Sequence, residues 1–144
     1  MPYEHTQIGY LMAGLFFAAA CIAVAIGAIW PSARVSFVIG ILLLLTVVFF
    51  HKLTVQIDNE TLRAWFGPGL ITKKVRMADI ASCEPIRIRW WYGWGIHLTP
   101  YGWLYNIAGW DAVAIRLRDR RTFALGTDDP QGLAAAIRRF ASAK

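Results

Sequence analysis

The chain has 144 residues, 57% of them hydrophobic, and a formal net charge of +6 at pH 7. This length leaves room for a short helical module and one small domain, not for several domains. Glu4 and Arg34 are the only charged residues before Lys52 and they cancel, so residues 52–144 hold the whole positive excess. Such a domain is attracted to anionic headgroups, although segments on the cytoplasmic side of a membrane are also basic for topological reasons.

Two apolar runs, residues 8–30 and 35–50, follow a short polar lead over residues 1–7. The first run has no charged side chain, and as a helix it would measure roughly 34 Å, enough for a hydrocarbon core of ~30 Å. Pro31 ends it and turns the chain. Backbone groups in lipid must be paired within their own segment. We therefore predict transmembrane helices over about 8–30 and 35–51, which together form an N-terminal hairpin over residues 1–51. A cleaved signal peptide is not expected, because residues 1–10 lack Lys and Arg and the apolar run is too long.

Small side chains recur at a spacing of four in the first run. Gly14 and Ala18 form one pair, and Ala23 and Gly27 form another. Each pair lies on one helix face and permits close approach of a second helix. The expected neighbour is the other helix of the hairpin, with a partner protein or a second copy of the chain as alternatives. Trp30 stands where an aromatic residue of the headgroup layer belongs.

The distribution of Lys and Arg predicts the orientation. Arg34 is the only cation in the hairpin loop, whereas Lys52, Arg63 and further Lys and Arg residues follow the second run. The positive-inside rule then places the N-terminus and the domain in the cytoplasm.

From Leu53 onward the apolar period changes to two, which is typical of strands with one buried face. A turn over 58–60 joins the first two strands, and Gly67-Pro68-Gly69 ends the second one. The predicted strands cover residues 53–57, 62–66, 70–76, 83–91, 113–118 and 122–125. A short helical turn is expected over residues 77–80.

A C-terminal helix is predicted to begin at Pro130, with Asp129 as its N-cap, and to run to about residue 141. Leu133, Ile137 and Phe140 recur at helical spacing and form the predicted buried stripe.

An unusual aromatic stretch, residues 90–110, separates the strands on either side. It contains Trp90, Trp91, Tyr92, Trp94, Tyr101, Trp103, Tyr105 and Trp110. A domain this small cannot bury all of them. Some are expected to be exposed or to face a membrane, or they form an aromatic mini-core at the open end of a sheet.

Three motifs carry a resemblance: Trp94-Gly95-Ile96, residues 102–106, and residues 126–130 followed by Leu133. They resemble small bacterial membrane proteins with two transmembrane helices and a PH-like domain. The resemblance implies a membrane α-helical hairpin plus an α+β PH-like domain over residues 52–144, that is, an antiparallel β-sandwich or barrel with a C-terminal capping helix. It also implies the bacterial inner membrane and no catalytic residues. The turn over 58–60 is acidic where PH domains carry basic residues, which argues against phosphoinositide binding.

Catalytic constellations are lacking in the sequence, and the two apolar runs contain no ionisable pathway, so neither an enzyme nor a transporter is expected. Cys21 and Cys83 form no metal-binding pattern, and no metal, cofactor or nucleic-acid partner is predicted. Two hypotheses remain. The first is an accessory or scaffolding subunit of a larger membrane protein complex, with self-association as a further possibility. The alternative is a lipid-surface module that binds anionic headgroups. The membrane-interface candidates are Trp30, Arg87, Arg89, Trp91, Trp94, Arg116 and Arg118, and Arg120 and Arg121 add to this basic set.

Overall fold

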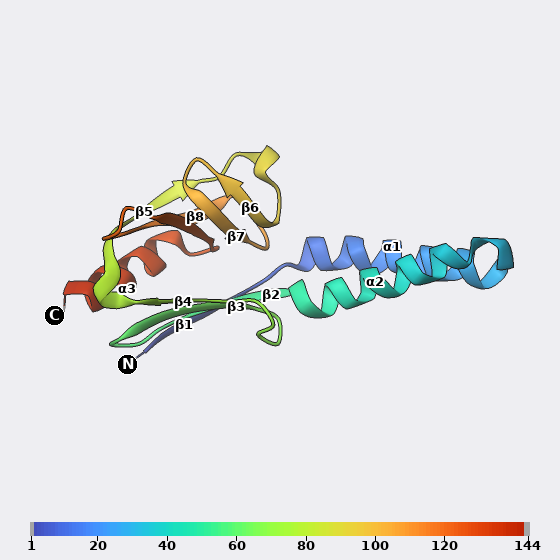
Figure 1. Cartoon of the computed structure of the whole chain (residues 1–144), viewed down its shortest axis with the longest axis horizontal. Helices are drawn as coiled ribbons and strands as arrows, with labels where there is room; N and C mark the ends of the chain where they lie inside the picture. The colour runs from blue at the N-terminus through green and yellow to red at the C-terminus, as the bar shows by residue number, and fades with distance from the viewer. Residues whose placement is uncertain (1, 143–144) are drawn as a thin grey trace.

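The computed structural model describes residues 2–142. Strand β1 (Tyr3–Ile8) leads into helix α1 (Tyr10–Ile29), the short 3₁₀ turn η1 (Pro31–Ala33) and helix α2 (Arg34–Phe50). The two helices form an antiparallel hairpin that projects from one end of a β-sheet domain (Figure 1). Both helices are long and apolar enough to cross a membrane. The predicted helical hairpin is therefore confirmed.

Residues 3–8 form a strand rather than the expected polar lead. β1 pairs antiparallel with β2 (Lys52–Ile57), from Tyr3 opposite Ile57 to Ile8 opposite Lys52. Polar side chains occur on both faces of β1, so no apolar alternation marks it in the sequence. The helical hairpin is consequently inserted between two neighbouring strands of one sheet.

Single residues make the two connections between hairpin and sheet. Gly9 lies between β1 and α1, and His51 lies between α2 and β2. The Gly9 N–H donates to the His51 carbonyl at 2.9 Å, so the hydrogen-bonded pairing of β1 with β2 extends to the first residue of the helices. The domain therefore meets the hairpin without a flexible linker.

Two sheets and a helix complete the α+β domain. The first sheet has the order β1-β2-β3-β4, with β3 (Thr61–Phe66) and β4 (Thr72–Arg76). After the 3₁₀ turn η2 (Met77–Asp79), the second sheet has the order β5-β8-β9-β7-β6. It consists of β5 (Ile80–Arg87), β6 (Gly95–Thr99), β7 (Gly102–Asn106), β8 (Asp111–Leu117) and β9 (Thr122–Gly126). All strand pairs are antiparallel except β7 with β9.

Helix α3 (Pro130–Ser142) packs against β5 and β8 and reaches β2, so it joins the two sheets. Its N-cap is the predicted one, because Asp129 Oδ1 accepts the Gly132 N–H at 2.9 Å. The predicted stripe is buried as well, and it shares one core with both sheets. That core includes Leu53, Val55, Ile57, Leu62, Phe66, Val113, Ile115, Phe123, Leu125, Leu133, Ile137 and Phe140.

The aromatic stretch differs most from the sequence prediction. The strand predicted over 83–91 begins and ends earlier, as β5, and residues 90–92 form the 3₁₀ turn η3 (Trp90–Tyr92). Strands β6 and β7 were not predicted. Each strand begins at a glycine and has only five residues, so its alternation is short.

Candidate functional site

The hairpin surface is apolar on all sides. In the residues described, α1 and α2 pack against each other, Met12 and Phe50 contact the domain core, and most of the remaining circumference is uncovered. The exposed side chains include Leu11, Leu15, Phe17, Ile22, Ile29, Val38, Leu42 and Val48, each more than half exposed. A water-facing surface of this kind requires a covering medium, either lipid or protein.

The seam between α1 and α2 is built on two glycines. A Cβ atom on Gly40 of α2 would lie 2.5 Å from Val24 Cγ2 and 2.9 Å from the Ala20 carbonyl oxygen. A Cβ atom on Gly27 of α1 would lie 2.6 Å from the Cβ and backbone N of Phe37. Both glycines therefore allow the two backbones to approach closely.

The four residues predicted for helix packing lie in different places. Gly27 lies in the seam and Ala23 is half-buried, whereas Gly14 and Ala18 are exposed. A Cβ atom on Gly14 would meet no atom within 4 Å. Both pairs have the predicted spacing of four, but only the pair Ala23 and Gly27 lies on the side of α1 that meets α2.

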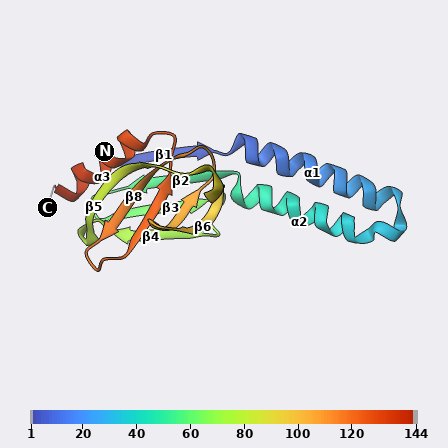
Figure 2. The same ribbon diagram turned by 90° about the horizontal axis from the view of Figure 1, so that it is seen from above.

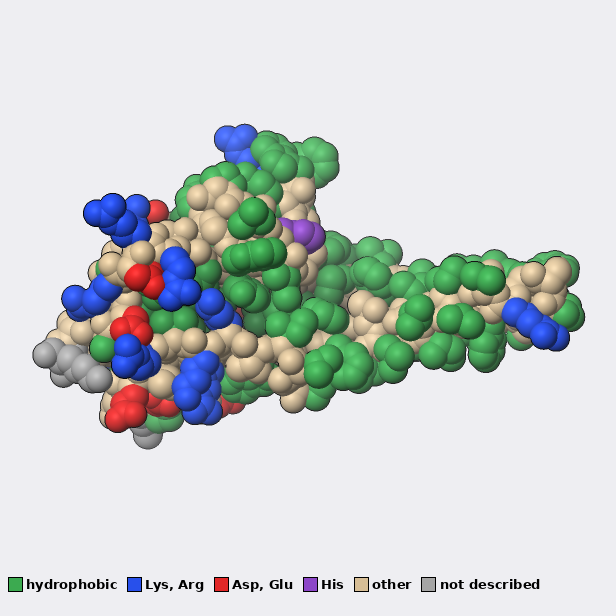
Figure 3. Space-filling model, viewed as in Figure 1, with side chains coloured by type: hydrophobic (Ala, Val, Ile, Leu, Met, Phe, Trp, Pro, Cys, Tyr) green, Lys and Arg blue, Asp and Glu red, His purple; other side chains and the backbone are tan. Residues whose placement is uncertain are grey.

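The domain has two ends relative to the hairpin. We call the end from which α1 and α2 leave the hairpin end, and the opposite end, which carries η2 and the β8–β9 turn, the distal end (Figures 1 and 2). On the face seen in Figure 3, Lys and Arg side chains gather over the distal part, while the hairpin is apolar apart from a cation at its tip. Trp30 lies at that tip and is 56% exposed.

The β3–β4 loop belongs to the hairpin end. The Gly67 N–H donates to the Lys52 carbonyl at 2.8 Å, and a Cβ atom on Gly67 would lie 2.5 Å from the Phe49 carbonyl oxygen. Its φ of +48° also favours glycine. The loop is thereby fixed against the last turn of α2. Leu70, near the tip of the loop, is 71% exposed.

Turn η3 also protrudes at the hairpin end (Figure 1). Trp90 is 73% and Trp91 55% exposed, and their rings meet edge to face at 6.0 Å. The Arg89 guanidinium lies 4.9 Å from the centre of the Trp91 ring. Together with Arg87 and Trp110, these residues line a shallow recess of about 520 Å³.

The remaining aromatic residues divide between core and surface. Trp94 stacks on Trp110 at 6.2 Å and both are half-buried, whereas Trp103 on β7 is 52% exposed. Tyr105 packs against the main core. The stretch therefore contains both exposed and half-buried aromatic side chains.

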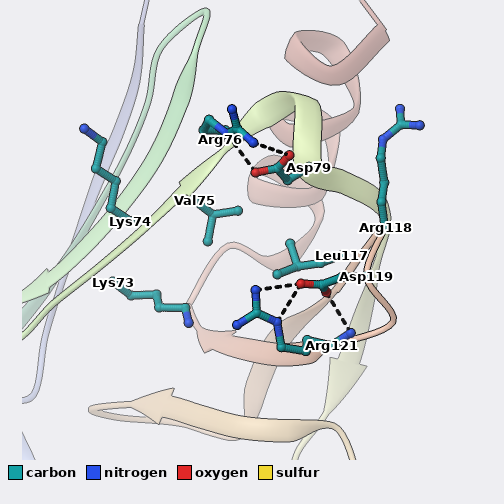
Figure 4. Close-up of a pocket in the computed structure, with 9 residues that line it drawn as sticks. All are labelled: Lys73, Lys74, Val75, Arg76, Asp79, Leu117, Arg118, Asp119 and Arg121. Atoms are coloured by element: carbon teal, nitrogen blue, oxygen red, sulfur yellow. Dashed lines mark hydrogen bonds and ion pairs between the residues drawn. The ribbon is translucent and has the colours of Figure 1, made fainter.

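A basic groove of about 620 Å³ lies at the distal end (Figure 4). β4 forms one wall, η2 the rim, and the β8–β9 turn the other wall. The lining residues are Lys73, Lys74, Val75, Arg76, Asp79, Leu117, Arg118, Asp119 and Arg121. The lining thus contains five cations and two carboxylates.

Two of the five cations are neutralised locally. Arg76 forms two hydrogen bonds with Asp79, at 2.9 and 3.1 Å. Arg121 donates to Asp119 at 2.6 Å from Nε, and its backbone N–H donates to the same carboxylate at 3.0 Å. These bonds from Arg121 lower the pKa of the Asp119 carboxyl. Both carboxylates are consequently already ion-paired with these arginines at neutral pH.

Among residues 2–142, the other three cations of the groove have no carboxylate within 4.0 Å. Arg118 Nε donates to the Ala78 carbonyl at 2.7 Å, which leaves its charge uncompensated. Lys73 Nζ lies 5.1 Å from the centre of the Phe123 ring, and Lys74 is exposed. The groove therefore keeps a net positive charge and can bind an anion.

The basic residues predicted for the lipid interface are divided between the two ends. Arg87, at the end of β5, pairs with Asp111 in the ladder and lies with Arg89 near η3. Arg116 and Arg118 lie at the other end of β8. The groove itself was not recognised in the sequence, because it requires β4 and the β8–β9 turn to be brought together by sheet packing.

Within the described part of the chain, no group of three or more His, Cys, Asp or Glu side chains could hold a metal ion. In comparisons with protein-family models, curated proteins and solved structures, nothing matches this chain. The site is therefore interpreted from its own geometry.

Proposed function

We propose that this protein is a membrane-anchored, non-enzymatic accessory subunit whose basic groove binds an acidic segment of a larger membrane protein complex. In this proposal the hairpin spans the bacterial inner membrane. The N-terminus and the domain, which we take to be PH-like, lie in the cytoplasm. The observation that carries the proposal is the groove with three uncompensated cations.

The position of the groove favours a protein over a lipid headgroup as the anion. β4 has five residues, so its distal end, where Arg118 lies beside η2, is roughly 15 Å from the loop at the hairpin end, whereas Lys73 and Lys74 lie nearer that loop. The Debye length at physiological ionic strength is about 8 Å. Lipid charges at the hairpin end are therefore largely screened at Arg118 and the distal part of the groove, whereas a cytoplasmic segment of a partner protein can reach it.

Two observations support the proposed orientation of the chain in the membrane. Pairing of β1 with β2 requires residues 3–8 and the domain to lie on the same side of the hairpin. Lys52 and the other cations after α2 favour the cytoplasmic side by the positive-inside rule.

A lipid-surface module is the second candidate. Arg87 and Arg89 favour it, because they lie at the hairpin end next to exposed aromatic side chains. Arg116 and Arg118 do not support it, since they lie at the far end of β8.

Matched charge reversals test the proposal. Tagged full-length protein is cross-linked in native membranes, purified in mild detergent and analysed for proteins and lipids by mass spectrometry. We compare Lys73→Glu/Lys74→Glu, in the groove, with Arg87→Glu/Arg89→Glu, which changes the net charge equally at the hairpin end. The amount of a stoichiometric membrane-protein partner recovered with the groove variant should be at least about tenfold lower than with the control. Equal retention by both variants, or loss in the control alone, would contradict the proposal.

A further inference from the structure

We propose that Leu70, Trp90 and Trp91 form a membrane-contact facet that enters the headgroup layer and holds the domain against the bilayer. The inference rests on the proposed membrane crossing by the hairpin, but not on the partner assigned to the basic groove. It assigns a second, non-helical membrane attachment to the soluble domain.

The helices leave no distance between the domain and the bilayer. α1 has twenty residues, so it measures about 30 Å, the thickness of the hydrocarbon core. Tyr10 at its first residue is 77% exposed and Trp30 just beyond its end is 56% exposed. Aromatic residues at both ends of one helix are typical of the two headgroup layers. Because Gly9 alone separates Tyr10 from β1, the hairpin end of the domain lies at the membrane surface.

The β3–β4 loop brings Leu70 to this level. The loop cannot move away from α2, because Gly67 is hydrogen-bonded to Lys52 and lies against the Phe49 carbonyl. Gly67-Pro68-Gly69 are ordinary turn residues, whereas Leu70, which follows them, is a large apolar side chain exposed to solvent. An apolar side chain fixed beside the end of a membrane-crossing helix is covered by lipid.

Turn η3 presents its two indole rings in a fixed arrangement. Ile88, just before the turn, is buried, and the Tyr92 N–H donates to the Arg89 carbonyl at 3.1 Å. The turn therefore places Trp90 and Trp91 on the surface of the domain. Figure 3 shows apolar side chains projecting at the top of the domain toward the side on which the hairpin leaves. Indole rings prefer the headgroup layer because they combine a large apolar area with one N–H donor.

Arg89 adds a polar contact to the facet. Its guanidinium lies over the Trp91 ring, which orients it while leaving its N–H donors available. A guanidinium beside an interfacial indole can bind a lipid phosphate with two parallel hydrogen bonds. The facet thus combines apolar insertion with one cation at phosphate depth.

The test measures the depth of single spin labels in nanodiscs of phosphatidylethanolamine and phosphatidylglycerol. Labels at Leu70→Cys and Trp90→Cys are compared in full-length chains without other cysteines. A label on native Cys21, in the middle of α1, is the lipid reference, and Ala78→Cys, exposed in η2, is the water reference. The readout is collision with oxygen, which concentrates in lipid, relative to a water-soluble nickel chelate.

Labels at residues 70 and 90 should lie between the two references, with nickel-chelate collision reduced at least about threefold relative to residue 78. In a Trp90→Ser/Trp91→Ser chain, the label at residue 70 should become more accessible to the chelate. Chelate access at 70 and 90 equal to that at 78 would overturn the inference. Low access to both reagents would also overturn it and would indicate a protein contact. A water-like label at Cys21 would instead refute the proposed membrane crossing, so the two failures are distinguishable.

Discussion

The substitution Gly40→Ala tests whether the two helices pack as closely as the structure indicates. The added Cβ would lie 2.9 Å from the Ala20 carbonyl oxygen and from the Val24 backbone N, against 3.4 Å or more in ordinary contacts. Backbone atoms cannot rotate away, so the helices must separate by about half an ångström to one ångström. A gap of that size removes a quarter to a half of each dispersion contact beside it. We expect a loss of about 1–3 kcal/mol, as in other overpacked interiors.

Gly14→Ala is the matched control. It makes the same chemical change in the other helix, where the new Cβ meets nothing within 4 Å. The assay is unfolding of the full-length chain in detergent micelles by titration with SDS. The Gly40 variant should unfold at a lower SDS fraction, whereas the Gly14 variant should unfold at the same or a higher SDS fraction than the unsubstituted protein, because alanine favours a helix over glycine. Equal midpoints for the two variants would refute the close packing.

Further predictions concern the domain. The Glu60 and Thr61 N–H groups donate to Asp58 at 2.9 and 2.7 Å, which lowers the pKa of its carboxyl. This stabilisation is present above the pKa of Asp58 in the unfolded chain and is lost as the pH falls through its lower value in the folded protein. Asp58→Ala should therefore lower the free energy of unfolding by about 1 kcal/mol at pH 7, and by less below about pH 4. A loss that stays constant with pH would contradict this. Burial raises the pKa of the Cys83 thiol. A maleimide should therefore label the exposed Ser82→Cys, in a chain with Cys83→Ser, at least about tenfold faster than native Cys83, and equal rates would show that β5 opens readily.

The sequence predicts the elements whose apolar pattern is decided locally. Leu53, Val55 and Ile57 alternate because one face of β2 meets the core. Asp129 and Pro130 mark the start of α3 through hydrogen bonding and a restricted φ, both properties of the segment itself. Two apolar runs predict two helices for the same reason.

Other features depend on which parts of the folded chain pack against them. β1 has no apolar face of its own and is defined by its pairing with β2. The spacing of Gly14 and Ala18 was as suitable for packing as that of Ala23 and Gly27, but the rotation of α1 decides which face meets α2. The basic groove likewise exists only after the two sheets have packed.

The insertion of the hairpin between β1 and β2 has a consequence for biosynthesis. β1 leaves the ribosome before either helix, while its partner β2 is the first strand made after both. With the hairpin in a bilayer, residues 3–8 must wait on the side of synthesis until the chain has crossed the membrane twice and returned. If residues 3–8 were left on the other side of the bilayer, β2 would keep an unpaired edge, which favours aggregation and degradation. Completion of the first sheet can therefore act as a checkpoint: only chains inserted with both ends on the same side acquire a closed β1–β2 ladder.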